Sequence, residues 1–191
     1  MKVCVCGGTN PAADKKWLDF ANELGDLMCE NDFEMVWGGN AFGVLSHVHQ
    51  EYVARNKPNT LVMPDAYQDD LLHMTPDKLV RTDLVVERTH QMFLLADVVV
   101  IVPGGIGTIY EFWSAVEGKR AGEYDFDIIL LNYRDFFKHQ LEHYDFINDE
   151  GFTKVGMGGA PYKIEPNDLF SVVKTPADVI TKLVQIQKIR G

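Results

Sequence analysis

The sequence predicts an α/β fold with a doubly wound, mostly parallel sheet and helices on both of its faces. Short apolar, β-branched segments alternate with longer amphipathic segments along the chain, which is typical of parallel strands joined by right-handed crossovers. One segment, Val98–Val102, is apolar and β-branched throughout, as expected of a central strand buried on both faces. Because no repeat, low-complexity tract or linker interrupts this alternation, we expect residues 1–191 to form a single domain.

The first half of the chain alternates strands and helices in order. Lys2–Cys6 is short and apolar and ends at a Gly-rich turn, which predicts a buried strand. In Ala12–Glu30 apolar residues recur every three or four positions, with charged residues between them, so an amphipathic helix is predicted there. The next predicted elements are the strand Phe33–Trp37, the helix Phe42–Arg55, the strand Thr60–Met63, a polar stretch at Asp65–Asp77, the strand Thr82–Val86 and the helix Glu87–Leu95.

The second half continues the same pattern. The strand Val98–Val102 leads into the turn Pro103–Thr108, and a helix is expected from there to about Glu117. The elements expected beyond it are a polar insertion at Gly118–Tyr124, the strand Asp127–Leu131, the helix Tyr133–Glu150, a loop at Gly151–Pro166, the strand Phe170–Val173 and the helix Pro176–Ile189.

The composition excludes several classes of protein. With 46% hydrophobic and 11% aromatic residues, the chain can bury a sizeable core, so disorder is excluded as its main state. Its 28 acidic and 18 basic residues give a net charge of −10, which repels polyphosphate chains, so no nucleic acid partner is expected. Three cysteines without C-x-x-C spacing predict neither a disulfide framework nor a zinc knuckle. No apolar run has membrane length and no leader is recognisable, so we expect no membrane partner and a cytoplasmic location.

Three glycine clusters, Gly7-Gly8, Gly38-Gly39 and Gly104-Gly105-x-Gly107, follow predicted strands. Ligands of doubly wound sheets bind at the carboxyl ends of strands, so these turns predict a cleft lined by backbone amides. The turn Pro103–Thr108 suits a phosphate, because glycines admit close approach and the following helix presents free N–H groups. Thr108 can cap that helix or donate its hydroxyl to the anion. The alternative is a tight turn without a ligand.

Two better-known phosphate motifs are not matched. The run Gly105-x-Gly107-x-x-Tyr110 lacks the third glycine of a dinucleotide site, and Trp37, not an acidic residue, ends the second predicted strand. Gly118-Lys119 is followed by arginine, which does not fit a P-loop. NAD binding and ATP hydrolysis are therefore disfavoured.

Glu111 and Arg88 are candidates for chemistry in the predicted cleft. Glu111 lies one helical turn beyond Thr108, so its carboxylate can face the glycine turn. Its alternative role is that of a first-turn glutamate favoured by the helix dipole. Arg88 is either a site residue or a solvated or salt-bridged side chain.

Histidine and cysteine patterns provide weaker candidates. His139-Gln140-Leu141-Glu142-His143 matches an inverted zinc-protease motif, but no third ligand is recognisable. His47 and His49 point to different faces of a predicted helix and are interpreted as surface or core residues. Cys4 and Cys6 share one face of a predicted buried strand, where small thiols are common.

The turn and helix at Pro103–Glu111 read P-G-G-I-G-T-I-Y-E. This run resembles the P-G-G-x-G-T-x-x-E signature of the LOG ("lonely guy") family, often labelled lysine-decarboxylase-like. The family pairs its signature with an upstream E-R-K segment, and Glu87-Arg88-Thr89 lies at the corresponding place, with 111 − 88 = 23 positions from Arg to Glu. The other matching segments are Cys6-Gly7-Gly8-Thr9 (family C-G-S-S), Val36-Trp37-Gly38-Gly39-Asn40 (V-Y-G-G-G), Val62-Met63-Pro64 (V-I-P) and Gly151-Phe152.

The resemblance implies a single Rossmann-like nucleotide-binding domain that cleaves the N-glycosidic bond of a nucleoside 5′-monophosphate to free base and ribose 5-phosphate. In plants and many microbes the family's substrate is a cytokinin ribotide; AMP is a simpler purine candidate. The resemblance makes Arg88 and Glu111 catalytic, with no cofactor and no metal, and implies a homodimer with the site near the subunit boundary. The residues implied to bind phosphate or substrate are Gly7, Gly8, Thr9, Gly38, Gly39, Asn40, Gly104, Gly105, Gly107 and Thr108.

The sequence also departs from the family pattern. Thr89 stands where the family has lysine, Asn40 replaces a third glycine, and Gly43-Val44-Leu45-Ser46 replaces G-L-M-G. The insertion at Gly118–Tyr124 and the loop at Thr153–Pro166 differ as well, so the base to be cleaved stays open. The alternative function is a non-catalytic nucleotide or molybdenum-cofactor carrier or sensor that uses the same glycine-rich site.

Overall fold

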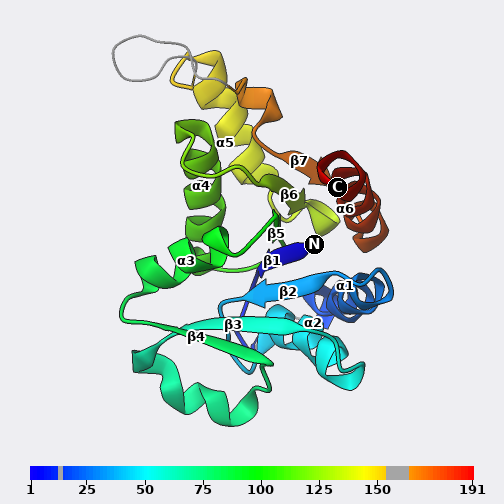
Figure 1. Ribbon diagram of the computed structural model, residues 1–191. Helices are drawn as coiled ribbons and strands as arrows, with labels where there is room; N and C mark the ends of the chain where they lie inside the picture. Colours follow the sequence, from blue (N-terminus) through cyan, green and yellow to red (C-terminus); the bar gives the residue numbers. More distant parts are fainter. Residues whose placement is uncertain (13–14, 154–163) are drawn as a thin grey trace.

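The computed structural model describes residues 1–12, 15–153 and 164–191, which contain one sheet of seven strands. All neighbouring strands are parallel, in the order β4-β3-β2-β1-β5-β6-β7 (Figure 1). The predicted doubly wound parallel sheet is therefore confirmed. The strands are β1 (Lys2–Cys6), β2 (Glu34–Trp37), β3 (Asn59–Pro64), β4 (Lys78–Thr82), β5 (Val98–Ile101), β6 (Asp127–Leu131) and β7 (Ser171–Val173).

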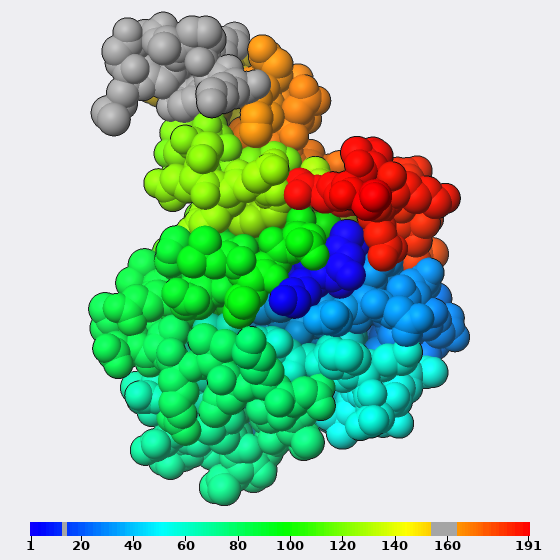
Figure 2. All heavy atoms as spheres, in the orientation of Figure 1, coloured from blue at the N-terminus to red at the C-terminus, as the bar shows by residue number. Residues whose placement is uncertain are grey.

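Helices cover both faces of the sheet. On one face lie α1 (Asp19–Glu30), α2 (Gly43–Ala54) and α6 (Pro176–Arg190), and on the other lie α3 (Val85–Leu94), α4 (Ile106–Ala121) and α5 (Lys138–Asp149). The space-filling view shows α6, in red, packed beside α1, in blue (Figure 2). None of the helices in the described ranges is long and apolar enough to cross a membrane.

The alternation of side chains along β1 divides the core into two layers. Val3 and Val5 pack with the α1, α2 and α6 layer, whereas Cys4 and Cys6 pack with the α3, α4 and α5 layer. The neighbouring strand β5 contributes to both layers, and all of its residues are fully buried. This confirms the prediction of a central strand covered on both faces.

The prediction of a strand at Thr82–Val86 is wrong. The strand β4 ends at Thr82, and Val85 begins α3. The Glu87 carboxylate accepts hydrogen bonds from the backbone N–H groups of Asp83 (3.0 Å) and Leu84 (3.1 Å) just before the helix. These bonds satisfy donors that a helix start leaves without backbone partners, and this local capping outweighs the strand propensity of the adjacent valines.

Other boundaries move by a few residues. The helix predicted from Ala12 begins as α1 only at Asp19, after a 3-10 turn at Lys15–Trp17. The helix α4 continues to Ala121, so much of the supposed polar insertion is its last turn. The helix predicted from Tyr133 opens with a 3-10 turn before α5, and the polar stretch after β3 is 3-10 helical at Asp65–His73. Most of the loop predicted at Gly151–Pro166 lies at 154–163, outside the described residues.

The strand order creates a crevice between β1 and β5. The chain builds outward from β1 through β2, β3 and β4, and then returns to place β5 on the opposite side of β1. The connections that follow β1 and β5 therefore leave the sheet in opposite directions. Doubly wound proteins bind ligands at such a reversal of strand order, at the carboxyl ends of the strands.

Candidate active site

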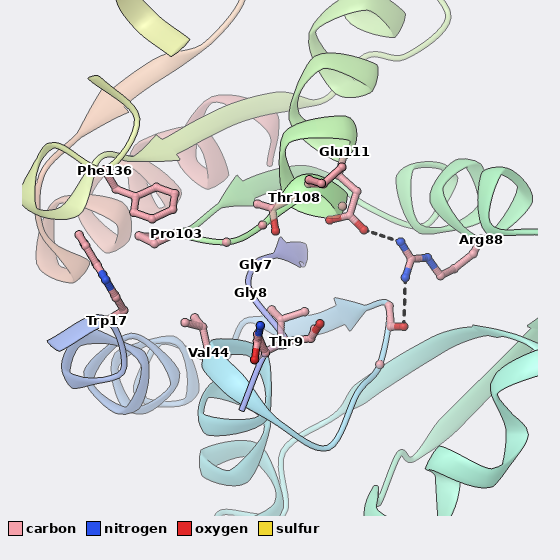
Figure 3. A pocket seen from close by; sticks show the side chains of 18 residues that line it. Gly7, Gly8, Thr9, Trp17, Val44, Arg88, Pro103, Thr108, Glu111 and Phe136 are labelled. Carbon is pink, nitrogen blue, oxygen red and sulfur yellow. Dashed lines mark hydrogen bonds and ion pairs between the residues drawn. The ribbon is translucent and has the colours of Figure 1, made fainter. Parts of the chain in front are cut away.

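A pocket of about 440 Å³ opens at this reversal of strand order (Figure 3). Its volume lies within the usual range of small-molecule sites, about 300–1,000 Å³. The turns that follow β1, β2 and β5 meet in it, together with side chains from α3 and α4. Among the residues singled out in the sequence, those that line it are Gly7, Gly8, Thr9, Gly38, Gly39, Arg88, Gly104, Gly105, Gly107, Thr108 and Glu111.

Asn40, which the sequence also placed in the site, does not line the pocket. Its φ angle is +103°, a backbone region that glycine favours and that asparagine tolerates better than most residues. Its side-chain oxygen accepts a hydrogen bond from the N–H of Phe42 (3.0 Å). Asn40 therefore adopts a conformation typical of glycine and shapes the turn that leads into α2.

The amino end of α4 faces the pocket with free hydrogen-bond donors. The residue at its N-cap position is Gly105, and no described side chain caps the helix. The prediction that Thr108 caps the helix is wrong, because Thr108 lies inside the first turn and is buried. A Cβ atom added to Gly105 or Gly107 would meet no neighbouring atom within 4 Å, so this side of each residue is open. An uncapped helix start beside open space is a ready site for an anion.

Arg88 and Glu111 form an ion pair at one end of this pocket. The Arg88 Nη2 atom donates to the Glu111 Oε1 atom at 2.6 Å, and Nη1 makes a long contact of 3.5 Å with the Gly38 carbonyl oxygen. Glu111 is 6% exposed and lies in the second turn of α4, not in the first turn that its alternative role requires. Arg88 is likewise mostly buried, so it is not a solvated side chain.

The environment of Glu111 favours the protonated acid more than water does. Burial raises the pKa of the Glu111 carboxyl, whereas the charge of Arg88 and a hydrogen bond from Cys6 lower it, and burial dominates. A buried carboxylate next to one arginine thus keeps a partner for its charge while losing most of its water. A carboxyl whose pKa is raised takes up and releases a proton at a higher pH than a fully solvated carboxyl, which favours a role as a general acid or base.

Sequence reasoning did not assign several residues to this site, and three of them bear on its chemistry. Cys6, interpreted as a core thiol, is buried at the end of β1, and its thiol also lowers the pKa of the Glu111 carboxyl. Trp17 and Phe136 line the pocket, although periodicity placed them on predicted helices. The signal for Cys6 was its position directly before Gly7-Gly8; only tertiary structure could reveal the two aromatic residues.

The remaining candidates lie away from the pocket. His139 is exposed and pairs with Glu142 at 2.9 Å, and in the described ranges no group of three or more His, Cys, Asp or Glu residues could hold a metal ion. His49 is buried and stacks on Trp37. Thr89, which replaces the family lysine, is buried and donates to the Val85 carbonyl oxygen at 3.1 Å.

Residues 37–183 match the model of a known protein family described as "Possible lysine decarboxylase". A probable cytokinin riboside 5′-monophosphate phosphoribohydrolase of Oryza sativa subsp. japonica is 25% identical over 188 residues, covering 95% of this chain and 71% of the relative. A cytokinin riboside 5′-monophosphate phosphoribohydrolase of Arabidopsis thaliana is 26% identical over 157 residues, covering 79% of this chain and 71% of the relative.

Solved structures share the fold over nearly the full chain. The molybdenum cofactor binding protein of the phototrophic bacterium Rippkaea orientalis has a TM-score of 0.69 and 20% identity, with 97% of this chain and 96% of that chain covered. The molybdenum cofactor carrier protein of Chlamydomonas reinhardtii has a TM-score of 0.68 and 21% identity, with 98% of each chain covered. These likenesses confirm the Rossmann-like fold class.

Proposed function

Because the chain belongs to the possible lysine decarboxylase family, that of the LOG phosphoribohydrolases, we propose that it hydrolyses the N-glycosidic bond of a purine-type nucleoside 5′-monophosphate. The products are the free base and ribose 5-phosphate. The observation that carries this proposal is the buried Arg88–Glu111 pair beside an open, uncapped helix start. The pair adds acid–base chemistry to a phosphate site, which a binding protein does not need.

The amino end of α4 holds the 5′-phosphate in this proposal. The N–H groups of Gly105 to Thr108 and the helix dipole attract the anion, although the chain as a whole carries a net charge of −10. Gly7, Gly8 and Thr9 form the opposite wall. Anchoring the phosphate here places the ribose toward Glu111, one turn further along the same helix.

Glu111 then acts on the bond between C1′ and the base nitrogen. As this bond breaks, positive charge develops on the ribose, and a nearby carboxylate stabilises it. Glu111 takes a proton from an incoming water, whose oxygen bonds to C1′ as the bond from C1′ to the base breaks, and this proton then passes to the departing base nitrogen, which returns Glu111 to its ionised form. Arg88 holds the Glu111 carboxylate in place and donates to the leaving base.

The test is a panel of ribo- and deoxyribonucleoside 5′-monophosphates that includes AMP and isopentenyl-AMP, with released base measured by chromatography. Release of a base supports hydrolysis and names the preferred substrate. Nucleosides without the phosphate should react far more slowly, because they lack the group that α4 binds. If the nucleotides raise the thermal unfolding temperature but release no base, hydrolysis is contradicted and the carrier function, as in the molybdenum cofactor proteins of similar fold, takes its place.

The pH dependence of the reaction tests the contact between Cys6 and Glu111. Glu111 must be ionised to take a proton from water, so kcat/KM should fall as the pH drops through the raised pKa of its carboxyl. The Cys6 thiol favours the ionised form, so Cys6→Ala should raise this pKa further and move the acidic limb up by about 0.5–1 pH unit. Cys6→Ser, which keeps a donor, should restore the limb.

Cys29→Ala is the matched control, because Cys29 is also buried but lies in the other layer of the core. Its removal should cost stability without moving the pH profile. An unmoved acidic limb in Cys6→Ala would show that the thiol does not influence Glu111.

We also propose that the protein is a homodimer that pairs through α3 and α4. A hollow between these helices is lined by the apolar side chains of Val86, Tyr110 and Trp113, and its lining also includes Glu87, Glu117 and Glu123; Val86 is 57% exposed and Tyr110 41% exposed. Apolar side chains gathered on a surface are typical of protein–protein contacts.

The dimer predicts a mass in solution of twice the 21.6 kDa chain, measured by light scattering. Val86→Glu should give monomers, because it places a charge in the apolar contact. Leu72→Glu, at an exposed position after β3, should leave the dimer intact. A monomeric native protein would overturn this proposal.

A further inference from the structure

The pocket extends past the start of α4, away from the Arg88–Glu111 pair. Arg88 contacts the carbonyl of Gly38 after β2, α4 begins after β5, and Phe136 follows β6. In the sheet these strands lie in the order β2-β1-β5-β6, so the carboxyl ends of β2 and β6 are about 14 Å apart at the usual strand spacing. The phosphate-binding end of α4 therefore lies between the Arg88–Glu111 pair and Phe136.

Two aromatic side chains form the far wall of the pocket. Trp17 comes from the 3-10 turn after β1, and its ring lies edge to face against Phe136, with 5.0 Å between the ring centroids and 78° between the planes. Both side chains are only half-buried and line the pocket. Figure 3 shows them opposite Arg88 and Glu111, with Thr108 and Gly8 between the two groups.

This aromatic end also carries positive charge. The Lys16 ammonium lies 5.2 Å from the centroid of the Trp17 ring, a cation–π distance. In a chain with a net charge of −10, a cation next to an aromatic wall suits an anionic group that is joined to a planar ring. Proteins commonly bind nucleotides by stacking aromatic side chains on the base and by pairing basic side chains with the phosphate.

We propose that Trp17 and Phe136 form a second subsite for a planar ring joined to the nucleotide through its 5′-phosphate. The preferred ligands are then nucleotides that carry a second ring system across a diphosphate link. This inference rests on the proposed function, because it takes the phosphate to lie at α4 and the ribose to lie toward Glu111. A mononucleotide in that orientation leaves the aromatic wall exposed to water, whereas a ring beyond the phosphate buries it.

Calorimetric titration with AMP and with diadenosine 5′,5′-diphosphate tests the subsite. Both ligands are titrated into Glu111→Gln protein, so that neither is consumed. We expect the diphosphate-linked ligand to bind at least about tenfold more tightly than AMP. In this background Trp17→Ala should weaken the dinucleotide at least about fivefold and change AMP binding less than twofold, and Trp17→Phe, which keeps a ring, should restore most of the difference.

Phe136→Leu provides a second variant that keeps apolar volume but removes the planar face, in case Trp17→Ala does not fold. Equal affinity for the two ligands would overturn the subsite. So would an equal loss of AMP and dinucleotide affinity in Trp17→Ala, because Trp17 would then hold the base of the mononucleotide itself. Base release by the native protein is a separate measurement, so failure of hydrolysis and failure of the subsite are distinguishable.

Discussion

Replacing Glu111 by glutamine should lower kcat for base release by about two to four orders of magnitude, the usual contribution of a general acid–base group. Glutamine has the same shape and keeps an oxygen that can accept the 2.6 Å hydrogen bond from Arg88, but it cannot take a proton from water. We expect KM to change only a few-fold, because the phosphate is held by α4. The measurement is chromatographic assay of released base, with nucleotide binding followed by calorimetry.

Glu142→Gln is the control for this substitution. Glu142 lies on α5, is exposed, pairs with His139 at 2.9 Å and lines neither the pocket nor the hollow between α3 and α4, so its loss should change kcat less than twofold. If Glu111→Gln does not fold, Glu111→Asp keeps the charge on a shorter side chain and should still lose activity through misplacement. Activity within tenfold of the native protein in a folded Glu111→Gln variant would remove Glu111 from the mechanism.

Much of the fold could be predicted from the sequence because its strongest elements are buried on both sides. The strand β5 has only apolar, β-branched residues, so no helical or half-exposed pattern competes with that interpretation. The edge strand β4 could not be predicted in this way. Its residues are partly exposed and include Lys78 and Arg81, and its pairing with β3 decides its position.

The site could be predicted only where residues that are close together in the sequence form it. The glycine turns and the spacing of Glu111 from Thr108 are local, and the structure places both in one pocket. The family resemblance assigned both Arg88 and Glu111 to the site, but their direct contact was not predicted and is seen only in the structure. Trp17 and Phe136 follow strands that are far apart in the sequence, β1 and β6. Their contact therefore depends on the order of the strands in the sheet and could not be predicted from the sequence.

The largest effect on stability is expected from Gly43→Ala. Gly43 begins α2 with a φ of +71°, and a Cβ atom there would lie 2.7 Å from the Gly8 carbonyl oxygen, 2.8 Å from the Thr9 carbonyl carbon and 2.9 Å from the Asn10 nitrogen. All three atoms belong to the backbone of the loop that follows β1. The left-handed backbone costs about 1–2 kcal/mol and overpacking about 1–3 kcal/mol, so the free energy of unfolding should fall by about 2–5 kcal/mol.

Gly122→Ala separates these two contributions. Gly122 also has a left-handed backbone, with φ of +78°, but a Cβ atom there would meet no neighbouring atom within 4 Å, so its replacement should cost only the conformational part, about 1–2 kcal/mol. Urea unfolding of both variants measures the difference, and equal losses would mean that the loop moves away from Gly43 without cost. Because Gly8 and Thr9 line the pocket, a folded Gly43→Ala protein should also bind AMP more weakly, whereas Gly122→Ala should bind it as the native protein does.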